Sequence, residues 1–395
     1  MKKLFYNRIA LISVILFQLG PLGALFAQGN WISYTNENTI LVDNKINDIL
    51  IVDGIKWIGT SWGLYTYDNS TWVDYSEYLP NPQVRSLTLD NNGILYVGTL
   101  NGIAVYDGAD WFTVTPDEDD SYLPGHINDI VFNSLNIGYI GTIDGLYKLE
   151  NETISLVLDS SSLEPTFINV RCLAMKGDSL CIGTINGGLA YYYNDSISWY
   201  NGSNGLIDNT ATDLLVSNEN VWVTAPYGGL ITHLNTGSFL VFNTGYFDNW
   251  PSNSLNCIIE DEGLYYIGTN EAGMFSLNYE GGVQNTTVYN TSNSGLINDD
   301  VLCIEKEDNG CWIGTEGGLT YWSETSVIEA FNAAPVFRFD GTNLSIDKPS
   351  DIVVFSIDGK KILRENNSNN LKLNGLSQGF YIISINNERF IIQKY

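Results

Sequence analysis

Seven copies of one short motif divide most of the chain into segments of similar length. An equivalent residue of each copy lies at positions 59, 98, 141, 183, 224, 268 and 314, so successive copies are 39 to 46 residues apart. Six copies read Gly-Thr there, and a glycine followed by an apolar residue comes shortly after, as in WIGTSWGL (57–64). A period near forty residues, built from short alternating strands and glycine turns, is typical of a β-propeller. The sequence therefore predicts an all-β fold with seven blades.

The second repeat shows what each blade contains. Four short strand patterns follow one another: VRSLTLD (84–90), ILYVGT (94–99), GIAVYD (102–107) and DWFTVT (110–115). The turn DNNG joins the first two, because Asn and Gly tolerate the positive φ of tight hairpins. The segment T-x-x-G joins the second and third, where glycine lets the backbone reverse without a Cβ clash. Each repeat is therefore predicted to form a four-stranded antiparallel blade.

The two ends of the repeat region complement each other. The seventh copy ends at Trp322 without a clear fourth strand, whereas a spare strand pattern, NWISYT (30–35), precedes the first copy. We predict that residues 30–35 complete the last blade, which closes the ring and removes an open sheet edge. The aromatic residues at the start of the motif, such as Trp57, Trp222 and Trp312, are predicted to lie in the core between blades.

Composition separates two further segments from the propeller. Residues 1–27 carry Lys2, Lys3 and Arg8 before an apolar run, which is typical of a secretory signal peptide. A retained membrane helix is the alternative there, and no later segment is apolar enough to span a bilayer. Residues 28–334 have a net charge of −32, whereas residues 335–395 have a net charge of +2. The latter are predicted to form a separate module, a small antiparallel β-sandwich.

This tail resembles the C-terminal sorting domain of the type IX secretion system of Bacteroidetes. The matching segments are VVFSIDGKKIL (353–363), LNGLSQGFYIISI (373–385) and RFIIQKY (389–395). The resemblance implies export across the outer membrane by the type IX machinery, followed by secretion or attachment to the cell surface. It also implies that this machinery is a partner of the tail.

The repeats resemble the two-component regulator propeller family, whose core pattern is W-x-G-T-x-x-G-L. The match covers most of residues 46–322, and the fifth copy departs from it with Thr224 and Ala225 in place of Gly-Thr. The sensor kinases of that family also carry a membrane helix and kinase domains. Neither occurs here, so direct signalling is not expected.

Charge disfavours two classes of partner and raises one question about metals. An acidic propeller repels nucleic acid phosphates and anionic lipid, so neither is expected as a partner. The acidic run at 116–120 could hold Ca²⁺, but it lacks the ordered spacing of a calcium loop, and we expect a solvated loop. His126 and His233 lie in different repeats, without a cluster of ligands. No cofactor and no metal site are therefore predicted.

Five cysteines occur in the chain. Cys172, Cys257 and Cys303 occupy one repeat position, which predicts a packing slot for a small residue more than a metal site. Other repeats fill this slot with Asp48, Ser86, Asp129 and Asp213. Cys172 and Cys181 lie on neighbouring predicted strands, which leaves a cross-strand disulfide open, although such geometry is often poor. An odd total leaves at least one thiol without a partner in the chain.

The turns between second and third strands are predicted to converge on one face around the central axis. They contribute Trp62, Asn101, Asp144, Asn186, Tyr227, Glu271 and Glu316 as candidate ligand-binding residues. Longer connections between blades add Tyr78, Tyr122, Tyr246, Phe247 and Trp250. Aromatic rings beside amides and carboxylates suit sugars, although Asn, Asp and Gly also suit ordinary turns.

These features favour a secreted or surface-exposed binding protein for a glycan or protein ligand, without enzymatic activity. No Gly-x-Ser-x-Gly, P-loop or HExxH motif occurs, and no catalytic residue is assigned. The alternative is a propeller glycosidase or polysaccharide lyase that uses Asp144, Glu271 and Glu316. A third interpretation is an envelope component of the type IX machinery itself.

Overall fold

The computed structural model describes two compact units, which contacts divide into Met1–Glu324 and Thr325–Tyr395. Residues 29–114, 126–151, 153–158, 169–247, 250–280, 283–308 and 310–323 are described in the first unit. Residues 337–339, 343–356, 360–373, 376–377, 379–385 and 388–394 are described in the second. The expected signal peptide at 1–27 lies outside these residues, as does the expected domain boundary after residue 334. Within the described ranges, no helix is long and apolar enough to cross a membrane.

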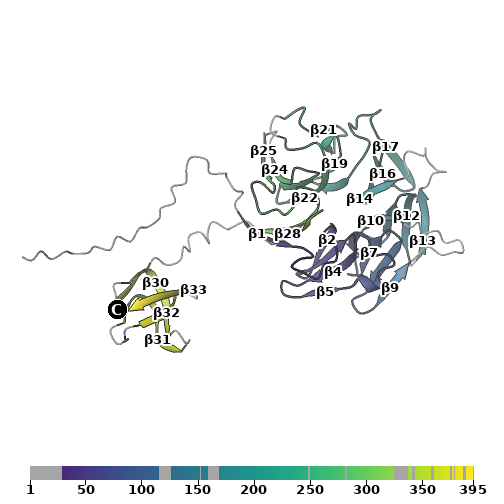
Figure 1. Cartoon of the computed structure of the whole chain (residues 1–395). Coiled ribbons are helices and arrows are strands. Elements are labelled where there is room, and N and C mark those ends of the chain that lie inside the picture. Colours follow the sequence, from purple (N-terminus) through teal and green to yellow (C-terminus); the bar gives the residue numbers. More distant parts are fainter. Residues whose placement is uncertain are drawn as a thin grey trace, which may run out of the picture. The chain divides into compact units, whose positions relative to one another are not determined.

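The first unit contains seven four-stranded antiparallel sheets, in agreement with the seven predicted blades (Figure 1). Blade one consists of β2 (Ile46–Val52), β3 (Ile55–Thr60), β4 (Gly63–Tyr67) and β5 (Trp72–Asp74). Blade two consists of β6 (Val84–Leu89), β7 (Leu95–Thr99), β8 (Gly102–Tyr106) and β9 (Trp111–Val114). Blade three consists of β10 (Ile127–Phe132), β11 (Gly138–Thr142), β12 (Gly145–Glu150) and β13 (Thr153–Leu158). Blades four and five consist of β14 (Val170–Lys176), β15 (Ser179–Thr184), β16 (Leu189–Tyr193) and β17 (Ser196–Tyr200); and β18 (Asp213–Ser217), β19 (Asn220–Ala225), β20 (Gly229–His233) and β21 (Phe239–Phe242). Blades six and seven consist of β22 (Leu255–Asp261), β23 (Leu264–Thr269), β24 (Met274–Glu280) and β25 (Val283–Tyr289); and β26 (Val301–Glu307), β27 (Gly310–Thr315), β28 (Gly318–Ser323) and β1 (Asn30–Tyr34). A short 3₁₀ turn, η1 (Ser76–Tyr78), follows blade one.

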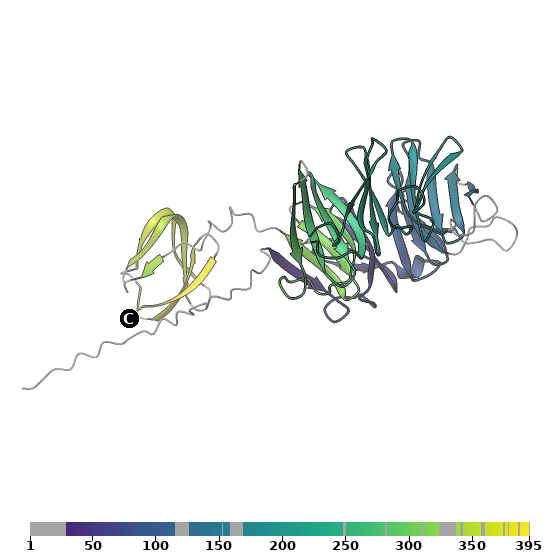
Figure 2. The same ribbon diagram turned by 90° about the horizontal axis from the view of Figure 1, so that it is seen from above.

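The N-terminal strand closes the ring, as predicted. β1 pairs antiparallel with β28, with Asn30 opposite Ser323 and Tyr34 opposite Leu319. The first strand of every blade contacts the first strands of both neighbouring blades, and β26 contacts β2. These first strands are therefore the innermost strands of a closed seven-membered ring, which Figures 1 and 2 show from two directions.

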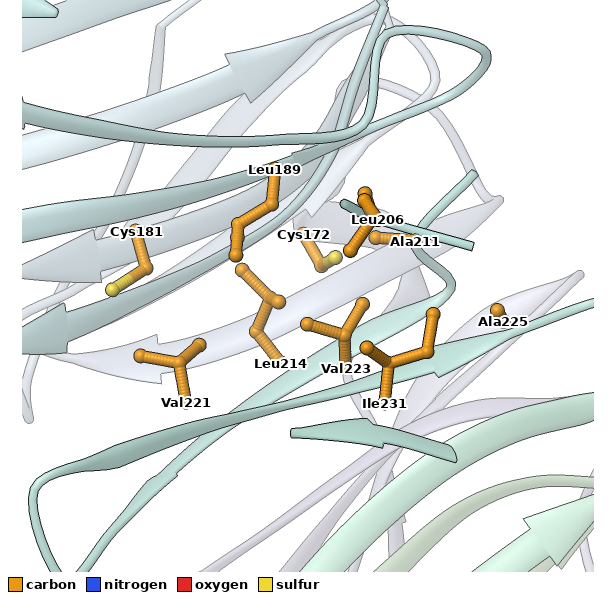
Figure 3. Packing of buried hydrophobic residues seen from close by; sticks show 10 residues of the cluster. All are labelled: Cys172, Cys181, Leu189, Leu206, Ala211, Leu214, Val221, Val223, Ala225 and Ile231. Carbon is orange, nitrogen blue, oxygen red and sulfur yellow. The ribbon is translucent and has the colours of Figure 1, made fainter. Parts of the chain in front are cut away.

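Apolar side chains fill the spaces between blades. Figure 3 shows one such space, where Leu189 of blade four packs with Leu214, Val223 and Ile231 of blade five. Trp57, Trp222 and Trp312 are buried, which confirms their predicted place in the core. Trp312 of blade seven, for example, contacts Tyr67 of blade one edge to face, with the ring centroids 6.0 Å apart. The blades are thus held together largely by burial of apolar surface.

The first glycine of the motif serves the joint between blades. A Cβ on Gly59 would lie 2.4 Å from Cγ1 of Val84, the first residue of the next blade's inner strand. The second glycine has the conformational role predicted from the sequence, because Gly63 has a φ of +134° in the turn. The first glycine of the motif therefore leaves room for a side chain of the next blade, and the second adopts the positive φ that the turn requires.

The second unit is one five-stranded antiparallel sheet. Its strands are β29 (Phe337–Phe339), β30 (Asn343–Ser356), β31 (Lys361–Lys372), β32 (Gly379–Ile385) and β33 (Glu388–Lys394). The long strand β30 pairs with β29, β31 and β32. Leu344 from one half of β30 and Val354 from the other join a single buried cluster with Leu371 and Ile383. The sheet therefore folds over its own core, as a small sandwich does.

Candidate ligand-binding face

The seven predicted site residues all lie in turns between second and third strands. In blade one the hydroxyl of Thr60 accepts a hydrogen bond from the backbone N–H of Trp62 at 3.0 Å and donates to the carbonyl of Gly63 at 3.0 Å. The same arrangement recurs with Asn101 in blade two and Asp144 in blade three. This local bonding fixes the turn, so the side chain between threonine and glycine is free to face solvent.

Blade five reaches a similar turn without the Gly-Thr pair. The carboxylate of Asp208 accepts the backbone N–H groups of Tyr227 and Gly228 at 3.1 and 2.9 Å. Asp208 precedes the first strand of the blade, so a connection between blades stabilises the turn beside it. The departure of the fifth copy from the motif is therefore compensated by a neighbouring loop.

The backbone ties these turns to the beginning of the inner strands. The N–H of Ser61 donates to the carbonyl of Lys45, and the N–H of Leu100 donates to the carbonyl of Gln83. Equivalent bonds join Glu316 to Asp300 in blade seven. The turns and the connections between blades therefore share one face, which we call the rim face.

The seven candidate residues are exposed on the rim face. Trp62 is 58% exposed and Tyr227 is 82% exposed, so both could stack on a ligand. No hydrogen bond or ion pair joins any two of the seven, all of which are among the described residues. The exposed set is Trp62, Asn101, Asp144, Asn186, Tyr227, Glu271 and Glu316.

Two of the candidate residues, Glu316 and Glu271, form bonds to residues of neighbouring loops. Glu316 forms an ion pair with Lys45 at 2.6 Å across the joint between blades seven and one. The backbone N–H of Glu271 donates to Asp300 at 2.7 Å, and Glu271 has a positive φ of 71°. These bonds hold both turns at the rim.

The aromatic residues of the longer connections are not all available. Tyr246 is 68% exposed, and Tyr78 is 41% exposed while stacking on Trp111 at 5.5 Å. Trp250 is buried against Phe275, so its predicted place on the binding face is wrong. Phe247 is half-buried and stacks on Phe242. Tyr122 lies outside the described residues.

A polar cavity lies inside the ring just below the rim face. It has a volume of about 170 Å³, and the inner strands of all seven blades line it. Its charged lining residues are Asp48, Arg85, Asp129, Arg171 and Asp213. The register places Asp48 opposite Gly59, directly beneath the turn that carries Trp62. No local sequence pattern marks this cavity, although its aspartates share the repeat position of Cys172.

The aspartates of the cavity join adjacent blades. Asp129 accepts the backbone N–H of Ile130 at 2.8 Å and that of Leu173, in the next blade, at 2.7 Å. Asp48 and Asp213 make the same pair of bonds within and across their own joints. The position is thus more than a packing slot, because an aspartate there connects two blades.

Desolvation raises the pKa of each cavity aspartate despite these hydrogen bonds. Burial raises the pKa of Asp129 to about 7 and that of Asp213 to about 6. Burial and the nearby carboxylates of Asp129 and Glu305 hold the pKa of Asp48 well above its usual range. These groups line the cavity, where their charged forms are less well hydrated than in bulk water.

The cysteines fit the packing interpretation. A Cβ on Gly183 would lie 2.4 Å from Sγ of Cys172, and Cys303 has the same relation to Gly314. Cys172 lies opposite Gly183, whereas Cys181 lies opposite Ala174, and both thiols are free. The cross-strand disulfide left open by the sequence is therefore not formed, because the register does not place the two cysteines opposite each other.

The described residues contain no group of three or more His, Cys, Asp or Glu side chains placed to hold a metal ion. His233 is buried, and its Nδ1 lies 2.6 Å from the hydroxyl of Tyr191. Its ring stacks on Phe239 at 4.4 Å, so it is part of the core. His126 is exposed before β10, and the acidic run at 116–120 lies outside the described part of the chain.

Comparisons with known proteins agree with both parts of this architecture. Residues 339–395 match the family described as the secretion system C-terminal sorting domain. Residues 78–101, in blade two, match the two component regulator propeller family. The chain therefore carries a type IX sorting domain that follows the propeller in the sequence, and one stretch of the propeller matches the regulator-type repeat. It is a secreted or outer-surface protein. No curated protein matches the chain significantly in sequence.

Solved structures with a similar fold come from several bacteria. One, from B. thetaiotaomicron, is described as the extracellular domain of a hybrid two component system; it has a TM-score of 0.66 and 18% identity, and the match covers 93% of this chain and 57% of that one. PorZ of Porphyromonas gingivalis, described as a surface component of the type-IX secretion system, has a TM-score of 0.53 and 13% identity, with 89% and 59% covered. Virginiamycin B lyase of Staphylococcus aureus has a TM-score of 0.58 and 12% identity, with 75% and 99% covered. The chain thus spans less than two thirds of the first two structures, and at these identities the similarity concerns the fold alone.

Proposed function

We propose that this protein is a non-enzymatic binding propeller of the cell surface or the extracellular space, which holds a glycan or protein ligand on its rim face. The observation that carries the proposal is the exposure of Trp62 and Tyr227 in equivalent turns of one face. Exposed Trp and Tyr rings offer a ligand a flat apolar face beside a polar group, and such residues are enriched at binding interfaces. The sorting domain supports the location, because such a protein meets its ligand outside the cell.

The proposed ligand class follows from the chemistry of the rim. Flat aromatic faces suit the apolar face of a sugar ring or of a protein side chain, and the amides of Asn101 and Asn186 suit hydroxyl and peptide groups. The rim also carries Asp144, Glu271 and Glu316, which repel anionic groups at short range. We therefore expect neutral or cationic ligands to bind here in preference to sulfated or uronic glycans.

A glycan and protein array, with hydrolysis assays run in parallel, tests this proposal. Any ligand found should bind less tightly to Trp62→Ala and Tyr227→Ala, by about 1–3 kcal/mol for each lost stacking surface. Tyr193→Ala is the matched control, because Tyr193 is 49% exposed at the opposite end of its blade. Equal loss from Tyr193→Ala, or no loss from the rim variants, would show that the ligand uses another surface.

The same experiment distinguishes the alternative functions. Glu271→Gln should leave binding nearly intact, with Glu262→Gln, in the β22–β23 hairpin at the opposite end, as its control. If Glu271→Gln abolishes turnover of a bound glycan, the protein is a glycosidase or lyase. If cells lacking this protein fail to export other proteins with sorting domains, it is a component of the secretion machinery.

A further inference from the structure

The two arginines of the propeller differ from its lysines in their ion pairing. Between residues 28 and 334 the sequence contains five lysines and two arginines, Arg85 and Arg171, among 39 acidic residues. Four of the lysines form ion pairs with acidic side chains at 2.6–3.0 Å. In the described part of the chain, neither arginine forms an ion pair.

Both arginines line the central cavity. They occupy the same repeat position, one residue after the start of the inner strands β6 and β14, where the register shifts at a β-bulge. The Nη2 of Arg85 donates to Oδ1 of Asn128 at the long distance of 3.4 Å. A guanidinium has five N–H donors, so most of the donors of both side chains are left for another acceptor.

Asp129 and Asp213 attract Arg171 electrostatically, but in the described part of the chain no aspartate of the cavity forms a hydrogen bond or ion pair with either arginine. The two oxygens of Asp129 already accept N–H groups of Ile130 and Leu173, and Asp48 and Asp213 are used in the same way. Their raised pKa values also reduce their negative charge near neutral pH. Burial and the charge of Arg171 lower the pKa of Arg85 to about 10, as expected for two like charges that face one partly desolvated space.

We propose that Arg85 and Arg171 form a site for a small oxyanion in the central cavity, of the phosphate, sulfate or carboxylate class. A volume of about 170 Å³ corresponds to roughly five water molecules, which suffices for such an anion and a few waters. Guanidinium groups bind planar and tetrahedral oxyanions through paired N–H donors. The oxyanion can be free in solution or belong to a larger molecule. This site is separate from the proposed ligand surface of the rim face, and either can exist without the other.

The test uses thermal unfolding and calorimetric titration of the mature protein with inorganic phosphate, against sodium chloride at equal ionic strength. A ligand that binds only the folded state raises the melting temperature. We expect phosphate to raise it for the wild type, and Arg85→Gln and Arg171→Gln each to weaken binding about ten-fold or more. Sulfate and acetate in place of phosphate show which oxyanion shape the site prefers.

Lys45→Gln is the matched control, because it removes one positive charge from the rim and leaves the cavity lining unchanged. It should retain the full phosphate effect. Phosphate and sulfate also stabilise proteins without binding at a site. An equal shift in all variants would therefore refute the proposal, as would the absence of any shift in the wild type. If a glutamine variant does not fold, Arg85→Lys and Arg171→Lys keep the charge and lose the paired donors, and unchanged affinity in both would equally overturn it.

The dependence on pH provides an independent check. Sulfate keeps its charge between pH 5 and 8, whereas Asp213 and Asp129 gain negative charge as pH rises through about 6 and 7. Sulfate binding should therefore weaken over this range. The titratable and charged groups that face the cavity are Asp48, Asp129, Asp213, Cys172, Cys257, Cys303, Arg85 and Arg171, with Glu305 beside them. Binding that strengthens as pH rises would contradict a site built on the two arginines.

Discussion

The joints between blades one and two, three and four, and five and six differ from the two joints that separate them. In the first group a polar pair connects each blade to the next, as when Asn128 Nδ2 donates to the carbonyl of Val170 at 2.8 Å and Asp129 accepts the N–H of Leu173. At the joints after blades two and four, the same positions hold Arg85–Ser86 and Arg171–Cys172. Among the residues that the structure describes, the hydroxyl of Ser86 has no hydrogen-bond partner.

This difference shows that one repeat position has two roles. In some blades its side chain bonds to the next blade, and in others it only packs, beside an arginine that lines the cavity. Where aspartate is present, each oxygen of its carboxylate accepts a backbone N–H group, one from its own blade and one from the next blade. Where Ser or Cys takes its place, packing alone fills the position, and the preceding arginine is turned to the cavity. The ring therefore combines polar joints with joints whose two arginines form no ion pair in the described part of the chain, although Asp129 and Asp213 attract Arg171 electrostatically.

The largest effect is expected at the closing joint, where β1 supplies a strand from the other end of the chain. A protein that begins at Glu37 should lose several kcal/mol of unfolding free energy relative to one that begins at Gln28. The reason is that Trp31 and Tyr34 no longer pack, and each contributes roughly 1.5–3 kcal/mol on the burial scale. Their aromatic partners are Trp322 at 5.8 Å and Trp312 at 5.6 Å.

Urea unfolding followed by tryptophan fluorescence measures this effect. Two single substitutions in the same strand provide a matched pair, since Trp31→Ala removes an inward side chain and Ile32→Ala removes one that is 50% exposed. Only the former should lower the midpoint appreciably. If the shortened protein and the full one unfold at the same urea concentration, the strand does not stabilise the ring.

The second largest effect compares the two kinds of joint directly. Asp129→Ala leaves the buried N–H groups of Ile130 and Leu173 without an acceptor, which should cost about 2–3 kcal/mol. Ser86→Ala, at the equivalent position, removes a hydroxyl that has no partner and should change stability by less than about 0.5 kcal/mol. Equal losses in chemical denaturation would mean that the hydrogen bonds of Asp129 do not distinguish the joints.

Much of this architecture is readable in the sequence because its signals are local. The number of blades follows from the repeat, the strands follow from alternation and glycine turns, and the closing strand follows from counting strands at both ends. The face that carries Trp62 and Tyr227 follows as well, since it depends only on which turns share an end of the blade. These features need no knowledge of contacts between distant residues.

The cavity and the polar joints are different, because they depend on contacts between repeats. Asp129 and Leu173 lie 44 residues apart, and nothing near Asp129 in the sequence shows that its carboxylate reaches across to the next blade. The burial of Trp250 is another such case, since the same loop exposes Tyr246. Aromatic residues of one loop look alike in the sequence, but tertiary packing buries one of them and leaves another exposed.

The next effect concerns pH, and within any one pH unit it is smaller than the preceding effect. Because burial raises the pKa of Asp129 to about 7 from an ordinary value near 3.8, the folded state binds this proton more tightly than the unfolded state does. The stability due to Asp129 is therefore present at low pH and is lost as pH rises from about 4 to about 7, by at most about 1.4 kcal/mol per pH unit. Asp129→Asn should flatten this slope when unfolding free energy is measured at several pH values.

Asp68→Asn serves as the control for that measurement. Asp68 is an exposed turn residue whose pKa is lowered by hydrogen bonds from Ser70 and Thr71. Its contribution has the opposite sign, since stability is lost only as pH falls below about 4. A slope between pH 5 and 7 that is identical in the wild type and Asp129→Asn would show that the buried carboxylate does not titrate in this range.

The smallest effect on stability is expected at the rim. There Asp208 holds a turn through hydrogen bonds, whereas the ring of Tyr227 in the same turn is exposed. Tyr227 is 82% exposed, and its turn is held by backbone N–H bonds to Asp208, not by its own ring. Tyr227→Ala should therefore change the unfolding free energy by no more than about 0.5 kcal/mol. Asp208→Ala leaves two N–H groups without their acceptor and should cost about 1–2 kcal/mol.

Chemical denaturation of both variants tests whether the ring of Tyr227 stabilises the fold. A loss above about 1 kcal/mol for Tyr227→Ala would make this ring a structural element. The proposed binding face would then lose its most exposed aromatic residue. A neutral result leaves that side chain available to a ligand on the proposed binding face.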